Sequence, residues 1–227
     1  MINKFYDTVR SALDGIKDGA TVLIGGFGSV GQPNALLDGL IDLGVRDLTI
    51  VSNNAGSIND GLGRLLATKR VRKLICSYPR SAVSKSTVFE DLYFAGELEL
   101  ELVPQGTLAE RMRAAGAGIP AFYTPTGVGT VLAKGKEIKT INGRDYVLEM
   151  ALHADVALIG AWAADRWGNL IYLRSGRNFN PVMATAAELT IAQVHHQAEL
   201  GELNPEMVVT PAAYVNRVVC VPEKVEP

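Results

Sequence analysis

Short apolar runs rich in β-branched residues alternate with segments of helical periodicity in the first third of the chain. The runs predict strands at 21–24 and 47–51, and the periodic segments predict helices at 33–43 and 60–67. Further apolar runs predict strands at 73–77, 99–103, 146–148, 156–159, 170–172, 207–210 and 217–219. This alternation is typical of an α/β fold with an open, mostly parallel sheet flanked by helices. We expect residues 1–227 to form a single domain.

Two segments rich in glycine and proline interrupt this alternation, at 104–106 and at 116–129. Neither has the periodicity of a helix or a strand. The longer segment is too apolar for a disordered linker, so we expect an ordered surface loop that approaches a ligand or another chain. A polar stretch follows at 134–144, in which Asn142-Gly143 predicts the turn of a small hairpin.

The turn after the first predicted strand carries the most informative spacing, Gly26-x-Gly28-x-x-Gly31. It fits the dinucleotide-binding fingerprint, in which glycines let backbone N–H groups approach a pyrophosphate at a helix N-terminus. The same turn could hold another carrier with phosphates, such as coenzyme A, or could be a tight turn that binds nothing. Pro33 at the first helical position and Gly44 beyond the last one support a helix directly after the turn.

A nicotinamide-binding fold would place an Asp or Glu after the second strand, where it binds the ribose hydroxyls. The sequence there is Ser52-Asn53-Asn54-Ala55-Gly56, which has no carboxylate and disfavours a dehydrogenase. This loop lies at the predicted carboxyl edge of the sheet, where open α/β proteins bind ligands. The alternative for it is an ordinary Asx turn.

Gln105 follows the predicted strand at 99–103 almost directly. A neutral amide at a strand end could donate a hydrogen bond to a developing oxyanion, or it could be a turn glutamine that points into water. The residues alone do not separate these two roles. Residues 165–169 and 177–181 combine charges, amides and aromatic rings at turns, which suits a ligand rim or a subunit contact equally well. Of these roles we favour a subunit interface or the anchoring of loops.

Charge and composition exclude several classes of protein. The net charge is −2, the pI is about 6.0, and no long Lys/Arg cluster occurs, which argues against a nucleic-acid binder. The N-terminus lacks an apolar signal core, and no apolar run approaches the ~18 residues of a membrane span. We therefore expect a cytoplasmic protein.

The residues that most often bind metals or form disulfides are few and scattered. Cys76 and Cys220 lie far apart in apolar surroundings, which predicts buried thiols without a disulfide. His153 and the pair His195-His196 have no metal-ligand spacing, so no metal site is indicated.

Glutamates alternate with leucines between positions 97 and 102. This period-2 pattern is typical of a strand with one wet face, so Glu97, Glu99 and Glu101 indicate a solvated face rather than a general acid and base. No HExxH motif, no Gly-x-Ser-x-Gly elbow and no Gly-Lys-Ser/Thr phosphate loop occurs. The sequence therefore shows no obvious nucleophile.

Longer motifs cover nearly the whole chain and resemble those of family I coenzyme A transferases. They are GGFGSVGQP, SNNAG, PQGTLAER, PAFYTPTG, DRWGNL and RNFNPVMA. Their extent resembles a complete A-type (α) subunit. Within the family, Cys76-Ser77-Tyr78-Pro79-Arg80 and the DRWGN segment look most like transferases that act on 3-oxoadipate, and transferases that act on acetoacetate share nearly all of the motifs.

The resemblance implies a covalent mechanism in which a glutamate attacks an acyl-CoA thioester. The intermediates are an acyl-glutamyl anhydride and an enzyme-CoA thioester, which split one difficult transfer into easier steps. In the family this glutamate belongs to a Ser-Glu-Asn-Gly motif, and no glutamate of this chain is followed by Asn-Gly. The resemblance therefore implies a B-type (β) partner subunit that supplies the nucleophile, in an αβ or (αβ)2 heteromer. It implies acyl-CoA as a substrate, with no permanently bound cofactor and no metal.

The same resemblance assigns roles to residues of this chain. The loop assigned to coenzyme A, here called the glycine loop, comprises Gly25, Gly26, Phe27, Gly28, Ser29, Val30 and Gly31. Gln105 would stabilise the thioester oxyanion, and Asn53 and Asn54 would line the acyl pocket. Arg80 could pair with the second carboxylate of a dicarboxylic substrate, because arginine binds carboxylates in a bidentate manner.

The chain departs from the family pattern at three places. Ser175-Gly176-Arg177 stands where Ala usually precedes Arg-Asn-Phe, Ala212-Ala213 stands where Gly-Ile is common, and His195-His196 replaces residues that are often acidic. These differences concern local packing and subfamily rather than the reaction class. Two alternatives to an enzyme subunit of this family remain, a non-catalytic acyl-CoA-binding or regulatory protein on the same scaffold and a Rossmann-type dehydrogenase.

Overall fold

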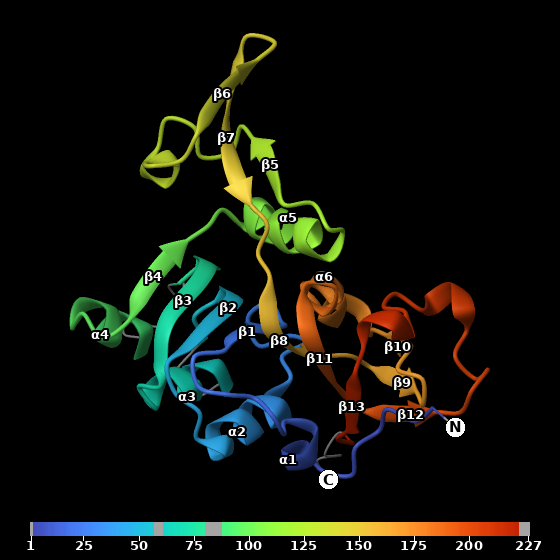
Figure 1. Ribbon diagram of the computed structural model, residues 1–227. Coiled ribbons are helices and arrows are strands. Elements are labelled where there is room, and N and C mark those ends of the chain that lie inside the picture. Colours follow the sequence, from blue (N-terminus) through green and yellow to red (C-terminus); the bar gives the residue numbers. More distant parts are fainter. Residues whose placement is uncertain (1, 57–60, 80–87, 223–227) are drawn as a thin grey trace.

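A parallel sheet of seven strands crosses the body of the computed structural model, which describes residues 2–56, 61–79 and 88–222 (Figure 1). In these residues every neighbouring pair of this sheet is parallel. Listed across the sheet, the strands are β13 (Arg217–Cys220), β11 (Ala187–Val194), β8 (Ala154–Gly160), β1 (Thr21–Ile24), β2 (Leu48–Asn54), β3 (Val71–Tyr78) and β4 (Glu99–Leu102). The predicted fold class is confirmed.

Helices cover both faces of this sheet (Figure 1). One face carries α1 (Val9–Ala12), α2 (Asn34–Leu43), α3 (Gly61–Ala67) and α4 (Val88–Phe94), and the other carries α5 (Gln105–Gly116) and α6 (Asn180–Ala184). Side chains alternate along a strand, so Val22 and Ile24 of β1 enter the core beneath α2, while Leu23 enters the core beneath α5 and α6. The sheet is therefore buried on both sides.

The helices predicted at 33–43 and 60–67 are confirmed as α2 and α3, with small differences at their starts. Pro33 is the N-cap of α2 rather than its first helical residue, and Gly44 ends the helix in a left-handed conformation with φ 82°. Position 60 lies outside the described residues, and the described helix begins at Gly61. The proline before the helix and the glycine after it thus predicted the bounds of α2 to within one residue.

Two three-stranded sheets flank the main sheet in the part of the chain that the structure describes. One contains β10 (Leu170–Ile171), β9 (Ala163–Asp165) and β12 (His196–Ala198), and the other contains β5 (Ala121–Thr124), β7 (Arg144–Met150) and β6 (Ile138–Ile141). The β5-β7-β6 sheet projects beyond α5 as an arm (Figure 1). Asn142 and Gly143 join β6 to β7 with φ 51° and 76°, the left-handed pair that a tight hairpin turn requires, so the predicted turn is confirmed.

Three sequence-based predictions need correction, and one strand of the main sheet was not predicted. Residues 121–124, predicted as loop, form β5 against β7. Residues 105 and 106, predicted as neither helix nor strand, begin α5, because Pro104 lies at the cap and the glycine is tolerated in the first turn. The strand predicted at 207–210 is absent from the described structure. Met207 belongs to the short helix η3 (Pro205–Met207), and Thr210 forms one isolated bridge with Leu170 of β10, which contains two residues. The sequence analysis did not predict β11, which lies between β13 and β8 in the main sheet.

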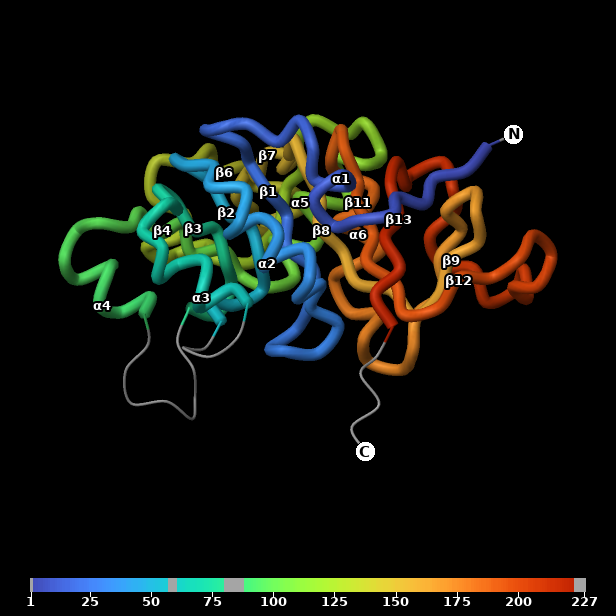
Figure 2. The backbone as a smooth tube through the Cα atoms, turned by 90° about the horizontal axis from the view of Figure 1, so that it is seen from below, coloured from blue at the N-terminus to red at the C-terminus, as the bar shows by residue number. Residues whose placement is uncertain are grey.

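The N-terminal segment closes the sheet beyond β13, and Figure 2 shows it passing alongside this strand. Phe5 forms a parallel bridge with Val218, and the two backbone N–H groups of Tyr6 and Val218 donate hydrogen bonds of 2.8 Å. The other short helices are η1 (Val131–Ala133), η2 (Arg174–Arg177) and η4 (Ala212–Tyr214). Among the described residues, no helix has the length and apolar character needed to cross a bilayer.

Candidate functional site

The glycine loop forms a tight two-residue hairpin between β1 and α2. Phe27 and Val30 exchange backbone hydrogen bonds of 3.0 and 3.2 Å across the turn. Gly28 has φ 61° and lies at the tip, a conformation that side chains with a Cβ disfavour. Phe27 is 52% exposed and Val30 47% exposed. The loop therefore presents backbone and two apolar side chains to the surface.

Asn180 of α6 fastens this loop to the rest of the sheet. Its Nδ2 donates to the carbonyl oxygens of Gly31 (3.1 Å) and Gly176 (2.9 Å), and its Oδ1 accepts from the backbone N–H of Gly160 (2.9 Å). Asn180 is fully buried, and a Cβ on Gly25 would overlap its Oδ1. The anchoring role predicted for residues 177–181 is confirmed.

The N-terminus of α2 is capped from within the chain. Oε1 of Gln193, at the end of β11, accepts from the backbone N–H groups of Ala35 (2.9 Å) and Leu36 (3.4 Å). In the dinucleotide-binding arrangement, such amides at the start of the helix hold the pyrophosphate. Here a side chain already satisfies them, so the glycine spacing builds a turn without the anion site of that fingerprint.

Three predicted or neighbouring polar residues meet at the carboxyl edge of β2 and β3. Asn53 lies near the end of β2 and is 3% exposed, and its Oδ1 accepts from Nε2 of Gln105 (2.7 Å) and from Oγ of Ser77 (2.7 Å). Ser77 of β3 also donates to the backbone oxygen of Asn53 at 3.0 Å. Gln105 is exposed at the first position of α5. The structure thus brings Asn53 and Gln105 together, and Ser77 is a member that sequence reasoning missed.

Asn54 has a more local role. Its Oδ1 accepts from the backbone N–H of Gly56 at 2.9 Å, and Ser52 Oγ donates to its carbonyl oxygen. This is the Asx turn that the sequence left open for this loop. Arg80, the remaining predicted substrate contact, lies outside the described residues.

The alternating glutamates form ion pairs. Lys73 Nζ lies 3.1 Å from Glu99 and 2.8 Å from Glu101, and Arg111 lies 2.7 Å from Glu101. Burial alone would raise the pKa of Glu101, but the hydrogen bonds from Lys73 and Arg111 outweigh it and lower that pKa. Glu97 pairs with Lys69 at 2.7 Å. These ion pairs connect β3, β4 and α5. A general acid needs a raised pKa, whereas this environment lowers the pKa of Glu101.

The cysteines are free thiols. Cys76 is fully buried, which raises its pKa to about 12, whereas Cys220 is half-buried. The prediction of two buried thiols therefore holds for Cys76 and in part for Cys220. Within the described ranges, no group of His, Cys, Asp and Glu side chains is arranged to hold a metal ion.

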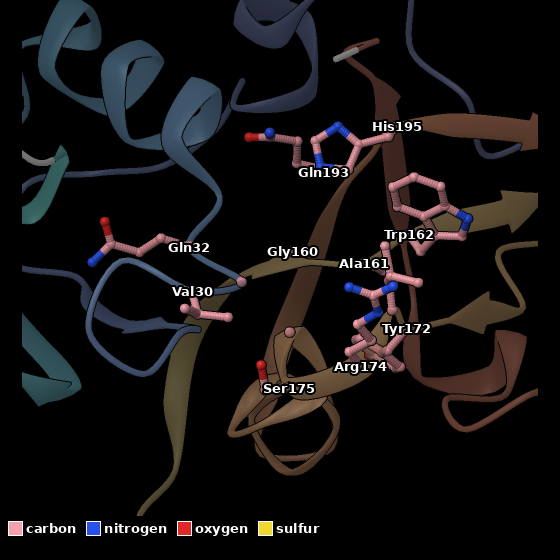
Figure 3. Close-up of a pocket in the computed structure, with 13 residues that line it drawn as sticks. Val30, Gln32, Gly160, Ala161, Trp162, Tyr172, Arg174, Ser175, Gln193 and His195 are labelled. Carbon is pink, nitrogen blue, oxygen red and sulfur yellow. The ribbon is translucent and has the colours of Figure 1, made fainter.

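A cavity of about 290 Å³ lies next to the glycine loop, on the side of the loop away from the Asn53–Gln105 pair (Figure 3). Its walls come from the glycine loop, the ends of β8 and β11 with the residues that follow them, and the segment 172–176, which includes most of η2. The lining residues are Val30, Gly31, Gln32, Gly160, Ala161, Trp162, Tyr172, Leu173, Arg174, Ser175, Gly176, Gln193 and His195. Sequence reasoning singled out several of these positions separately, but no local pattern could show that they enclose one space.

Comparison with known proteins decides the family. The model of the family described as coenzyme A transferase matches residues 6–221. The chain belongs to the coenzyme A transferase family. It is 59% identical to the A-type subunit of 3-oxoadipate CoA-transferase from Pseudomonas putida over 221 residues, 97% of this chain and 95% of that protein. It is 53% identical to the A-type subunit of succinyl-CoA:3-ketoacid coenzyme A transferase from Xanthomonas campestris pv. campestris (strain B100) over 224 residues, 97% of this chain and 91% of that protein.

Solved structures of CoA-transferases share the fold. Glutaconate coenzyme A-transferase from Acidaminococcus fermentans matches with a TM-score of 0.84 at 22% identity, over 96% of this chain and 76% of that chain. An acyl-CoA transferase from E. coli O157:H7, described as a thioester complex with CoA, matches with a TM-score of 0.82 at 22% identity. That match covers 98% of this chain and 48% of the other, so this chain spans about half the length of that protein.

Family membership and the names of the relatives identify an A-type chain of a CoA-transferase, which corrects the dehydrogenase alternative. CoA-transferases use coenzyme A in thioester form as a substrate. Both relatives are named as the A-type member of their enzymes, which implies a B-type partner for this CoA-transferase chain too. The Asn53–Gln105 pair and the glycine loop are then its candidate contributions to the active site.

Proposed function

We propose that this chain and a B-type partner together move CoA from succinyl-CoA to a 3-oxo acid, with 3-oxoadipate as the first acceptor and acetoacetate as the second. The names of the relatives support the choice of substrates. The observation that carries the proposal is the 2.7 Å hydrogen bond from Gln105 to Asn53. It holds a neutral amide donor at the carboxyl edge of the sheet, one strand away from the glycine loop.

The proposed chemistry needs a carboxylate nucleophile from the partner. A glutamate in a Ser-Glu-Asn-Gly motif attacks the thioester carbonyl, and the C–S bond breaks. CoA departs as the thiolate, and the acyl group remains on the glutamate as an acyl-glutamyl anhydride. The thiolate then attacks the glutamyl carbonyl, which releases succinate and forms the enzyme-CoA thioester. The acceptor acid repeats these steps in reverse and leaves as its CoA thioester.

Residues of this chain stabilise and position the reactants in this proposal. Gln105 donates to the oxyanion that develops on the thioester carbonyl, where a preorganised donor is effective because it needs no reorientation. Asn53 and Asn54 line the acyl pocket, and the glycine loop lies against coenzyme A. The exposed Phe27 and Val30 give the loop apolar surface for the carrier.

Co-expression tests the division of labour. The chain is purified alone and together with a B-type chain that contains Ser-Glu-Asn-Gly, and CoA exchange from succinyl-CoA is measured with a panel of 3-oxo acids. We expect activity in the αβ or (αβ)2 heteromer and none in the chain alone. Activity of the isolated chain would disprove the role of the partner. Failure to associate with any such chain would favour a stand-alone acyl-CoA-binding protein.

Arg80 provides a separate test of acceptor selectivity. In the assembled enzyme, Arg80→Ala should lower kcat/KM for 3-oxoadipate much more than for acetoacetate, because only the former has a second carboxylate for a guanidinium. Arg144→Ala, on the exposed arm, is the matched control. An unchanged ratio of the two acceptors would remove Arg80 from substrate recognition.

A further inference from the structure

The cavity next to the glycine loop lies on the opposite side of β1 from the Asn53–Gln105 pair. In the sheet, β8 and β11 flank β1 on one side and β2 and β3 flank it on the other. Gly160 and Gln193 at the ends of β8 and β11 line the cavity, whereas Asn53 and Ser77 lie near the ends of β2 and β3. The cavity and the Asn53–Gln105 pair therefore lie on opposite sides of the strand that leads into the glycine loop.

The cation Arg174 at this cavity has no partner among the described residues. Arg174 forms no hydrogen bond or ion pair with any residue in the described part of the chain, and none of the described lining residues is Asp or Glu. Figure 3 shows its side chain extending from η2 toward Ala161 and Trp162. A guanidinium with no acidic partner among the described lining residues favours an anionic occupant.

The backbone at Arg174 is held in an unfavourable conformation. Its φ is 49°, in the left-handed region that residues with a Cβ seldom adopt. Such conformations persist where the surroundings impose them, and they cluster at binding sites. The left-handed backbone at Arg174 therefore coincides with the position of this residue in the cavity wall.

The rest of the wall is aromatic and apolar, with one further nitrogen. Tyr172 shares a 2.7 Å hydrogen bond with Thr210, so its hydroxyl is engaged and its ring remains as surface. His195 directs Nδ1 at the carbonyl oxygen of Val221 (3.1 Å), which makes Nδ1 the protonated nitrogen and leaves Nε2 at the other edge of the ring. Trp162 packs against His195 with ring centroids 5.8 Å apart.

From this arrangement we propose that the cavity binds a small aliphatic carboxylate, whose charged group pairs with Arg174 and whose carbon chain packs on Trp162 and Tyr172. A volume of about 290 Å³ suits a compound of that size and is too small for coenzyme A. Two of the departures from the family pattern, Gly176 and His195, line this same cavity. The site is separate from the proposed acyl pocket and does not depend on it.

Tryptophan fluorescence reports on this site directly. The chain contains two tryptophans, so Trp167→Phe leaves Trp162 as the single reporter. The full-length Trp167→Phe protein, alone and assembled with the B-type partner, is titrated with succinate and with adipate at constant ionic strength. We expect a saturable change in emission, and an affinity at least tenfold weaker in the added variant Arg174→Gln. The exposed Arg10 supplies the matched control, because Arg10→Gln removes a surface guanidinium far along the chain from the site.

A second variant distinguishes binding from a structural role. Arg174→Gly removes the guanidinium and also relieves the left-handed strain, so we expect an unchanged or higher melting temperature together with loss of the fluorescence response. The proposal is overturned if Arg174→Gln and Arg174→Gly bind succinate as tightly as the parent protein, or if potassium chloride alone produces the same change. Tighter binding of inorganic phosphate than of either carboxylate would also overturn it, since the site would then be a phosphate site.

Discussion

Nε2 of Gln105 donates a 2.7 Å hydrogen bond to Oδ1 of Asn53, and this bond joins the start of α5 to the end of β2 across 52 positions of sequence. A glutamine amide nitrogen carries two hydrogens, so one remains for a ligand. Ser77 donates to the same oxygen of Asn53, which holds the acceptor in place. The orientation of the Gln105 amide is therefore set before a substrate arrives.

Replacing Gln105 tests its proposed role in oxyanion stabilisation. In the assembled enzyme, Gln105→Ala should lower kcat by about 10²- to 10³-fold, the usual cost of one lost oxyanion donor. Stopped-flow or steady-state CoA exchange measures this loss. Gln197→Ala, an exposed glutamine on β12, should leave kcat unchanged. Wild-type turnover in Gln105→Ala would exclude the residue from the mechanism.

Asn53 should act on the reaction partly through Gln105. Asn53→Ala frees the Gln105 amide, so the double variant should be little slower than the worse single variant. A double-mutant cycle on kcat/KM should then give a coupling of about 1–3 kcal/mol. Strictly additive effects would show that the two side chains act independently. Circular dichroism melts of all three variants verify that the measured proteins are folded.

Asn180 should matter for stability as well as for the glycine loop. Asn180→Ala leaves the polar groups of Gly31, Gly160 and Gly176 without their partner, and the expected loss is about 2–4 kcal/mol in the free energy of unfolding. Urea unfolding measures it. The control is Asn204→Ala, an exposed cap of a short helix, for which about 1 kcal/mol or less is expected. A loss at Asn180 no larger than the control would contradict the fastening role.

The lowered pKa of Glu101 predicts that this residue makes a pH-dependent contribution to the free energy of unfolding. Its folded-state pKa is lowered, so the carboxylate contributes its full stabilisation above the ordinary pKa of a glutamate, and the contribution is lost as the pH falls through the folded-state pKa. Glu101→Gln should therefore cost about 1 kcal/mol at pH 7 and progressively less in acid. Unfolding curves at pH 7 and at acidic pH measure this difference.

Glu206→Gln is the reference for this comparison, because Glu206 is exposed on η3 and forms no ion pair within the described residues. It should change stability little at either pH. A penalty for Glu101→Gln that stays constant or grows in acid would refute the assignment of the stabilisation to the ionised carboxylate.

The glycine loop shows which structural features the local sequence can predict and which it cannot. Gly28 is required by the turn itself, because its φ of 61° is a backbone property that neighbours in sequence determine. Gly25 has a different reason, since its missing Cβ makes room for Asn180 on α6. That second reason is invisible in the sequence, because it depends on a contact across 155 positions that only the packed sheet creates.

Gln193 also shows that a contact between distant segments cannot be predicted from the local sequence. The glycine spacing predicts a helix N-terminus with free amides, and α2 does begin there. The side chain that caps those amides comes from β11, a strand that the apolar pattern did not reveal. The strand predicted at 207–210 did not form because Met207 belongs to η3 and the rest of the run meets only the two-residue strand β10, through a bridge between Thr210 and Leu170.

The sequence by itself determined the α/β class, most strands, the hairpin turn at Asn142-Gly143 and the transferase family, because periodicity, turn residues and contiguous motifs are local properties of a chain. Only the tertiary structure decided that Asn53 meets Gln105 and that Arg174, which has no partner among the described residues, lies at a cavity next to the glycine loop. Both depend on the order in which parallel strands are arranged in the sheet. That order is set by packing between distant segments, and it determines which strand ends, and therefore which side chains, share an edge.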